Sequence, residues 1–218
     1  MKKISTQKHN KNRNRKGQSL IEALVALSLL MTALLGIETL LTRSFLLDRV
    51  TADQTKATYL ASEGVEVMKS LIDHQVYDAI ANPGGIPDDP DTGGWYNFCD
   101  LGAGQTAYYQ IDYMATSCPV PGQSGFLGYD QRTASANAVP LSFASSTDDG
   151  LTDMYCQPGA PDCQPGGTAT AFTRIIKVTK DGTGNEIDVQ STVTWSTGSV
   201  TNQSLTLEDQ FYNWNPGD

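Results

Sequence analysis

A candidate processing site lies near the start of the chain, at the peptide bond between Gly17 and Gln18. Seven of the fifteen Lys and Arg residues precede this bond, and no acidic residue occurs before Glu22. A stretch without any charge follows from Ala23 to Ile37. Because glycine has no side chain, a peptide with glycine at this position can enter a protease site beside a membrane surface. Cleavage after Gly17 would remove the basic leader and leave the apolar segment on the mature protein.

Glu22 is the second candidate, because it places a carboxylate at the start of the apolar stretch. An unpaired carboxylate in hydrocarbon costs several kcal/mol, so a partner is expected. Cleavage would create a charged amine at Gln18, and the amine of an adjacent, axially shifted copy could form an ion pair with Glu22. Such a pair would set the register between copies. The alternative is that Glu22 reaches the lipid head groups at a helix N-terminus, where acids are favoured.

The run KGQSLIEALVAL, which begins at Lys16, resembles the signature of type IV prepilins. That signature is a basic leader ending in glycine, a glutamate at the fifth mature position and an unbroken apolar helix. The resemblance covers residues 11–42 and implies cleavage after Gly17 by a prepilin peptidase, with methylation of the new terminus. It also implies a long N-terminal helix packed on an antiparallel sheet, with a cysteine-bearing C-terminal region. The family usually begins its mature chain with phenylalanine, where this chain has Gln18.

Gly36 lies inside the apolar stretch, although glycine costs about 1 kcal/mol in a helix. Two interpretations stay open. The helix could stretch or melt there when it is packed in a filament, or small residues could let neighbouring helices approach closely. Glu38, near the end of the stretch, is interpreted as an interfacial residue.

Other chemistry finds little support in the sequence. His9 lies in the leader and His74 follows the long helix, so neither a His-rich metal site nor a catalytic triad can be argued. No glycine-rich phosphate loop is present. Two acidic loops, Asp181–Asp188 and Ser146–Asp153, place oxygen ligands at intervals, and Asp181, Asn185 and Asp188 are weak calcium candidates, but neither loop has the spacing of an EF-hand. We therefore expect no enzyme, no cofactor and no assigned metal.

The four cysteines follow the apolar segment, at Cys99, Cys118, Cys156 and Cys163. If that segment exports the C-terminal part, an oxidising environment favours two disulfides. A zinc site is the alternative, but the sequence has no Cys-x-x-Cys pair. Pairing of nearest neighbours, Cys99 with Cys118 and Cys156 with Cys163, closes the shortest loops and is the predicted choice among three possible connectivities.

The elements that would position these residues begin with one long helix, from about Gln18 to Asp73, which at 1.5 Å per residue is roughly 80 Å long. Its second half carries apolar residues at spacings of three and four, the helical period. These predicted core residues are Ala57, Leu60, Ala61, Gly64, Val67, Met68, Leu71 and Ile72. The Pro- and Gly-rich segment from residue 82 to 94 predicts a loop.

Alternating apolar and polar residues predict strands in the C-terminal part. One covers Ala107–Met114, and a meander of at least three antiparallel strands begins with Phe172–Thr179. The segment KDGTGNE after that strand is typical of a hairpin turn. Residues 115–170 are rich in Ser, Thr, Gly, Pro and Asp, and no regular structure is expected there.

Together these patterns and the resemblance to type IV prepilins predict an α+β, type IV pilin-like fold with a cleaved leader (1–17), a transmembrane and filament-core helix (18–42) and an extracellular head (43–218). Without the leader, 8 basic and 24 acidic residues give a formal charge of −16, which would repel nucleic acid and anionic lipid. The expected function is a non-enzymatic subunit of a homo-oligomeric helical filament on a bacterial surface. Its expected partners are the membrane, as a single span before assembly, the prepilin peptidase and an assembly platform. The alternatives are a minor pilin, a type II secretion pseudopilin or a permanently anchored binding protein.

Overall fold

The computed structural model describes residues 15–81, 95, 98–113, 115, 138–144, 154–158, 168–198 and 200–213. The chain divides into two compact units, Met1–Val50 and Thr51–Asp218. Their main elements are one long N-terminal helix and strands that pair antiparallel, so the α+β class with a long helix packed on an antiparallel sheet is confirmed.

The long helix, α1, covers Arg15–Ala81 and includes 67 residues. It therefore contains the predicted helix and ends eight residues later than expected. The chain reaches Pro83 before meeting a proline, so nothing in the backbone stops the helix earlier. In the second unit, α1 packs one face onto the sheet, and all eight predicted core residues are buried there. The helical period thus predicted the buried face correctly.

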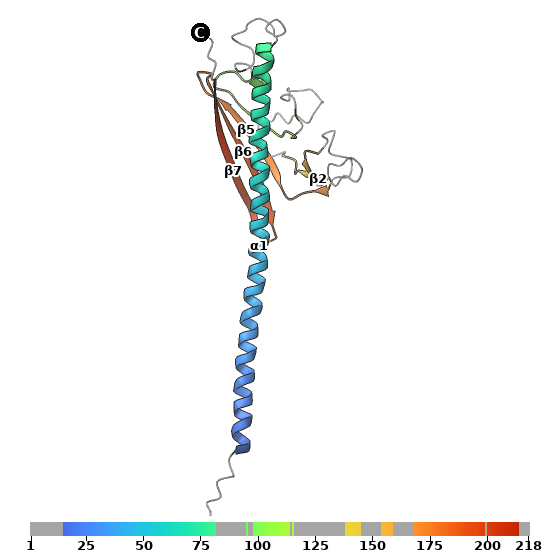
Figure 1. The fold of residues 1–218 in the computed structure, drawn as a ribbon, viewed down its shortest axis with the longest axis vertical. Coiled ribbons are helices and arrows are strands. Elements are labelled where there is room, and N and C mark those ends of the chain that lie inside the picture. Colours follow the sequence, from blue (N-terminus) through green and yellow to red (C-terminus); the bar gives the residue numbers. More distant parts are fainter. Residues whose placement is uncertain are drawn as a thin grey trace, which may run out of the picture. The chain divides into compact units, whose positions relative to one another are not determined.

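The main sheet has the strand order β1-β5-β6-β7, and every neighbouring pair is antiparallel. Its members are β1 (Thr106–Tyr109), β5 (Thr173–Lys180), β6 (Glu186–Thr197) and β7 (Val200–Tyr212). Strands β5, β6 and β7 form the predicted meander, and they run beside the second-unit part of α1, drawn in cyan to green (Figure 1). The residues of β6 alternate between buried and more exposed positions, as expected for a strand with one covered face.

The first strand is shorter than predicted. Strand β1 ends at Tyr109, whereas the sequence suggested a strand as far as Met114. The reason lies at Gln110. Its buried side chain forms hydrogen bonds with backbone groups that a continuing strand would otherwise bond. Its amide Nε2 donates to the carbonyls of Val139 and Arg174, both at 3.0 Å, and its Oε1 accepts from the Val139 amide at 3.1 Å.

A second, smaller sheet corrects the expectation that residues 115–170 lack regular structure. Its strands have the order β3-β2-β4 and are β2 (Ser142–Ala144), β3 (Met154–Cys156) and β4 (Thr168–Ala169). A short 3-10 helix, η1 (Phe98–Asp100), precedes β1. Strands of two or three residues are too short to show an alternating pattern, and this is why the sequence did not reveal them.

Two apolar clusters form the core of the second unit. One joins α1 to β1, β5 and β6 and includes Met68, Leu71 and Ile176. The other joins Leu60 on α1 to Phe172, which directly precedes β5, and to Trp195 on β6, and the small sheet packs against it through Tyr155 on β3. Aromatic ring contacts continue the second cluster outward, from Trp195 to Phe172, then to Tyr155 and Phe143.

Candidate functional site

The candidate site is the N-terminal part of α1, which exposes a large apolar surface. Its large hydrophobic residues have 43–70% of their surface exposed. They are Leu20, Ile21, Leu24, Val25, Leu27, Leu29, Leu30, Met31, Leu34, Leu35, Ile37, Leu40, Leu41, Phe45, Leu46 and Leu47. Because these positions include consecutive residues, the apolar surface surrounds the helix on all sides. A helix of this kind is stable only when a lipid or protein surface covers it.

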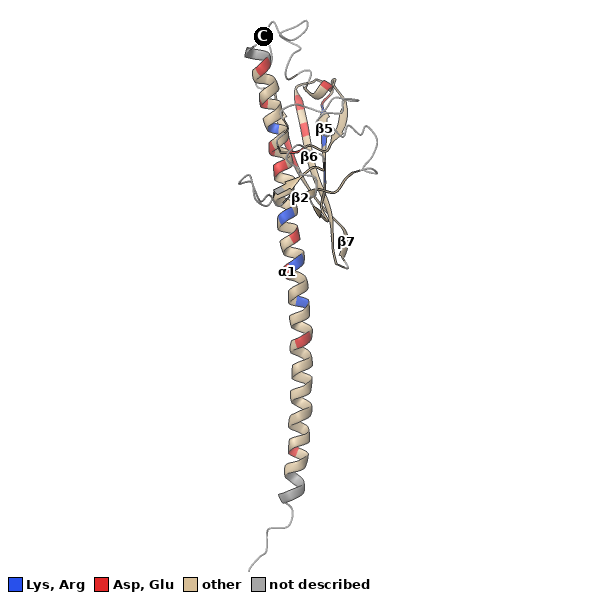
Figure 2. Cartoon of the chain, turned by 90° about the vertical axis from the view of Figure 1, so that its right-hand side faces the viewer, with Lys and Arg blue, Asp and Glu red and all other residues tan. Residues whose placement is uncertain are grey.

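Within the described residues, α1 is the one helix long and apolar enough to cross a membrane. Charge is sparse along this part of the helix and frequent in its second half (Figure 2). The length and composition therefore fit a membrane-inserted segment.

Four hydroxyl groups on this surface hydrogen-bond to the backbone of the helix itself. Ser28 Oγ donates to the Val25 carbonyl at 2.8 Å, and Thr32 Oγ1 donates to the Leu29 carbonyl at 2.9 Å. The Thr39 and Thr42 hydroxyls bond to carbonyls one turn back in the same way. Each hydroxyl can therefore enter an apolar environment without losing its hydrogen bond.

Glu22 lies in the same exposed surface and is not in an ion pair with any residue that the structure describes. Its neighbours one turn along the helix are Val25 and Ala26, which offer no positive charge. A partner for this carboxylate must therefore come from outside the described part of the chain. The prediction that the partner is a neighbouring copy's terminal amine stays a prediction.

The predicted scissile bond lies in the first turn of α1, because the helix begins at Arg15 and both Gly17 and Gln18 are helical. The first four N–H groups of a helix have no helical acceptor, so this turn opens more easily than the helix interior. Gly17, Gln18 and Glu22 thus lie within two turns of one another. Gly36 lies 14 residues beyond Glu22, which is roughly 21 Å along the helix axis, so it belongs to a separate part of the surface.

Gly36 has open space around it. A Cβ atom built at this position would meet nothing within 4 Å. Nothing in the described chain therefore requires glycine at position 36, and both interpretations of Gly36 depend on contacts with other molecules.

The cysteines are only partly described. Cys99 and Cys156 are each disulfide-bonded. Their predicted partners, Cys118 and Cys163, lie outside the described residues, so the pairing stays a prediction.

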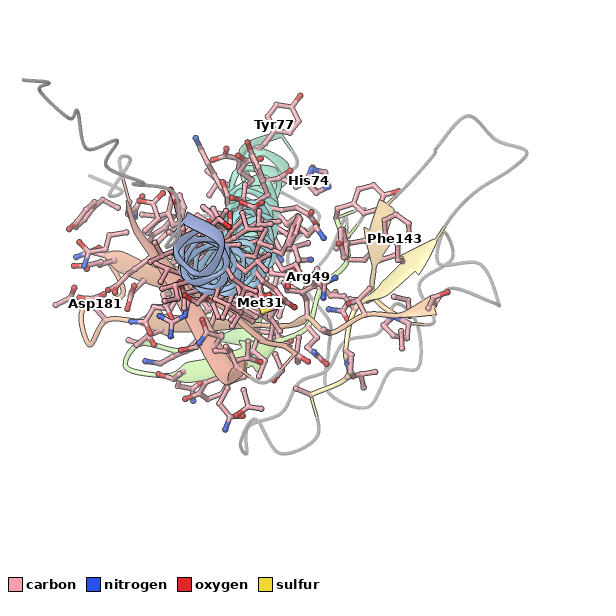
Figure 3. The ribbon with its side chains drawn as sticks, turned by 90° about the horizontal axis from the view of Figure 1, so that it is seen from below. Met31, Arg49, His74, Tyr77, Phe143 and Asp181 are labelled. Carbon is pink, nitrogen blue, oxygen red and sulfur yellow. The ribbon has the colours of Figure 1, made fainter. Side chains whose placement is uncertain are left out.

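The calcium candidates lie in the turn between β5 and β6 and at the start of β6. The Asp181 carboxylate accepts the hydroxyl of Thr183 and the backbone N–H groups of Glu186 (3.0 Å) and Thr183 (3.1 Å). These hydrogen bonds, that of the Thr183 hydroxyl first, lower the pKa of Asp181 to about 2. Asn185 lies in the same turn, and Asp188 lies on β6, where burial and then Glu208 raise its pKa. Figure 3 shows Asp181 at the edge of the second unit, on the opposite side from Phe143. No group of three metal-binding side chains occurs among the described residues.

Two buried cations were missed in the sequence, and both lie on the inward face of β5. Arg174 has 2% of its surface exposed; its guanidinium donates to Glu63 Oε1 (2.8 Å), the Leu60 carbonyl (3.0 Å) and the Ile111 carbonyl (2.8 Å). Lys180 donates to the Trp95 carbonyl at 2.9 Å, and burial lowers its pKa to about 8. Their positions could have revealed them, because Arg174 and Lys180 fall at the same alternating positions of the strand as the buried Ile176 and Val178.

Comparison with protein families finds a match in the N-terminal part of the chain. The prokaryotic N-terminal methylation motif, the signature of type IV pilins and pseudopilins, matches residues 12–37. The matched range covers the predicted cleavage site, Glu22 and Gly36, and it ends inside the exposed apolar part of α1. No curated protein and no solved structure matches the chain.

Proposed function

We propose that the chain is the structural subunit of an extracellular, type IV pilus-like filament. It is made as a membrane-inserted precursor and is cleaved after Gly17 by a prepilin peptidase. The observation that carries this proposal is that the methylation motif at residues 12–37 lies on the one described helix whose apolar surface is exposed on all sides.

The exposed apolar surface supports two successive environments. Before assembly, lipid covers the helix as a single span, and the basic leader stays on the cytoplasmic side. After assembly, the same helices of neighbouring copies cover one another in the filament core. The acidic second unit, whose core is complete within itself, then faces the solvent as the filament surface.

Glu22 gives the assembly its register. In hydrocarbon the carboxylate is strongly disfavoured without a cation, and cleavage creates one at Gln18 of each copy. Sliding one helix along the other separates the two charges in a medium of low dielectric constant, so the pair selects one axial offset. The chain's part in the filament is binding and positioning, and no catalytic step is assigned to it.

The test combines the mass of the subunit with one charge-removing substitution. Filaments sheared from the native cells should contain a chain that begins at Gln18, as read by mass spectrometry. Glu22→Gln should insert and be cleaved normally but should lower the ratio of filament protein to membrane protein sharply. Glu66→Gln is the matched control, because Glu66 is an exposed glutamate on the same helix outside the apolar stretch.

Three results would contradict the proposal. A mature chain that retains Met1 supports a permanently anchored protein, and the absence of the chain from surface filaments excludes the structural role. Normal incorporation of Glu22→Gln would show that the carboxylate is not an assembly contact.

A further inference from the structure

Glu38 and Arg43 are the only charged residues of α1 between Ala23 and Leu47. Both are exposed, and neither forms an ion pair with a residue that the structure describes. They lie on the same apolar surface as Glu22, at the opposite end of the stretch. The proposed function uses Glu22 but leaves these two charges without a role.

The two residues cannot neutralise each other within one copy. Residues five apart lie about 140° apart around a helix, whereas side chains meet only at separations of three or four. The helical neighbours of Glu38 are Leu34, Leu35, Leu41 and Thr42, and those of Arg43 are Thr39, Leu40, Leu46 and Leu47. Each charge is therefore surrounded by uncharged and mainly leucine side chains.

We infer that Glu38 of one copy forms an ion pair with Arg43 of the adjacent copy, so that a second copy of this chain is the partner of this surface. The inference rests on the proposed function, because it needs the helices to pack in a filament. A lone charge pressed against leucine is unstable, whereas an arginine and a carboxylate form a paired, bidentate contact.

The register set by Glu22 supports this pairing. If the terminal amine at Gln18 of one copy lies level with Glu22 of its neighbour, the two helices are offset by four residues, or about 6 Å. The same offset brings Glu38 of the first copy level with Thr42 of the neighbour, one residue and about 1.5 Å from Arg43. One axial shift therefore serves both ion pairs.

The arrangement around the helix agrees with a shared neighbour. Glu22 and Arg43 are 21 residues apart, which places them within about 60° on the same side of α1. The amine that meets Glu22 is a backbone group at a helix end, so it is not fixed to one face of its own helix. The reverse offset separates Glu38 from Arg43 by nine residues, or about 13 Å, so the pair also gives the contact a direction.

Charge reversal in the full chain, in its native cells, tests the pairing. Glu38→Arg alone and Arg43→Glu alone each place like charges opposite one another in every contact. Each should lower the ratio of filament protein to membrane protein roughly tenfold or more. Co-expression of the two variant chains should restore filaments that contain both, because the introduced arginine of one chain then faces the introduced glutamate of the other. Glu66→Arg, an equal change of charge elsewhere on α1, is the control and should assemble like the parent.

The mixture keeps the test decisive. Rescue by mixing cannot come from repaired folding, because both chains keep their substitutions. If the single variants assemble like the parent, or if the mixture fails although both chains reach the membrane at parental levels, the pairing is wrong while the proposed function stands. If the parent itself is absent from filaments, the proposed function fails and the pairing fails with it.

Discussion

Gly64 allows the contact between α1 and the main sheet to be tested with a single methyl group. A Cβ atom at this position would clash with Ser191 Oγ and would lie 3.2 Å from both Ser191 Cβ and Arg174 Cδ. The contact with Ser191 Oγ is far below van der Waals distance, so either the serine must rotate or the helix must move. Arg174 cannot yield freely, because its guanidinium is held by three hydrogen bonds. We therefore expect Gly64→Ala to destabilise the protein.

The size of the effect follows from two opposing contributions. Overpacking a close contact costs about 1–3 kcal/mol. Rotation of the Ser191 hydroxyl leaves the contacts with Ser191 Cβ and with the hydrogen-bonded Arg174 side chain in place, so the cost should lie near the upper end. Replacing glycine by alanine inside a helix raises the free energy of unfolding by about 1 kcal/mol. The net loss of unfolding free energy should be about 2 kcal/mol, which lowers the Tm by roughly 4–8 °C for a protein of this size.

The assay is thermal unfolding of the full chain in detergent micelles, followed by tryptophan fluorescence, because Trp195 is buried beside the helix. Gly36→Ala is the matched control on the same helix, and with open space around Gly36 it should not lower the Tm. Ser191→Ala removes a buried hydroxyl that has no hydrogen-bond partner in the described structure, and it should be nearly neutral alone. Combined with Gly64→Ala, it should recover part of the loss. A Gly64→Ala protein as stable as the parent, or no recovery in the double variant, would refute the close-contact argument.

Three further predictions concern the second unit. Glu63→Gln should cost about 3 kcal/mol in urea unfolding, because it leaves the buried Arg174 guanidinium without its counter-charge; Arg174→Met should cost less, because the Glu63 side chain that remains is one-third exposed and can hydrate, and a smaller loss for Glu63→Gln would contradict this. The pKa of Lys180 is about 8 when folded and 10.5 when unfolded, so the unfolded chain binds more protons between these values. Parental stability should therefore rise with pH from about 8 to 10.5 relative to Lys180→Met, and parallel pH profiles would show that the burial effect is absent. Peptide mapping without reduction should recover the two nearest-neighbour disulfides, whereas a peptide joining Cys118 to Cys156 would exclude that connectivity.

The features that the sequence predicted well are those whose signal is local. The buried face of α1 could be predicted from the sequence because small and aliphatic residues such as Ala61 and Met68 recur at the helical period. The roles of Gly17 and Glu22 could be proposed from the sequence because they depend on residues within a few positions along the chain.

The features that were missed depend on contacts between distant residues. Arg174 is charged, and its bonds to the Leu60 and Ile111 carbonyls and to Glu63, which lie 114, 63 and 111 residues away, make its burial possible. No local pattern contains that information. Gln110 ends β1 for a similar reason, because its side chain binds a segment 29 residues further along the chain.

The distance along the chain between Leu60 and Arg174 also sets a timescale for biosynthesis. The face of α1 that β5 covers leaves the ribosome 114 residues before Arg174 does. At about 5–20 residues per second, that apolar face stays uncovered for roughly 6–23 s while the covering strands are still being made. During this interval the nascent helix exposes a continuous apolar surface, and chaperones or the adjacent membrane must cover that surface to prevent aggregation. Substitutions that slow the closing of the sheet should thus reduce the yield of protein even when the finished fold is equally stable.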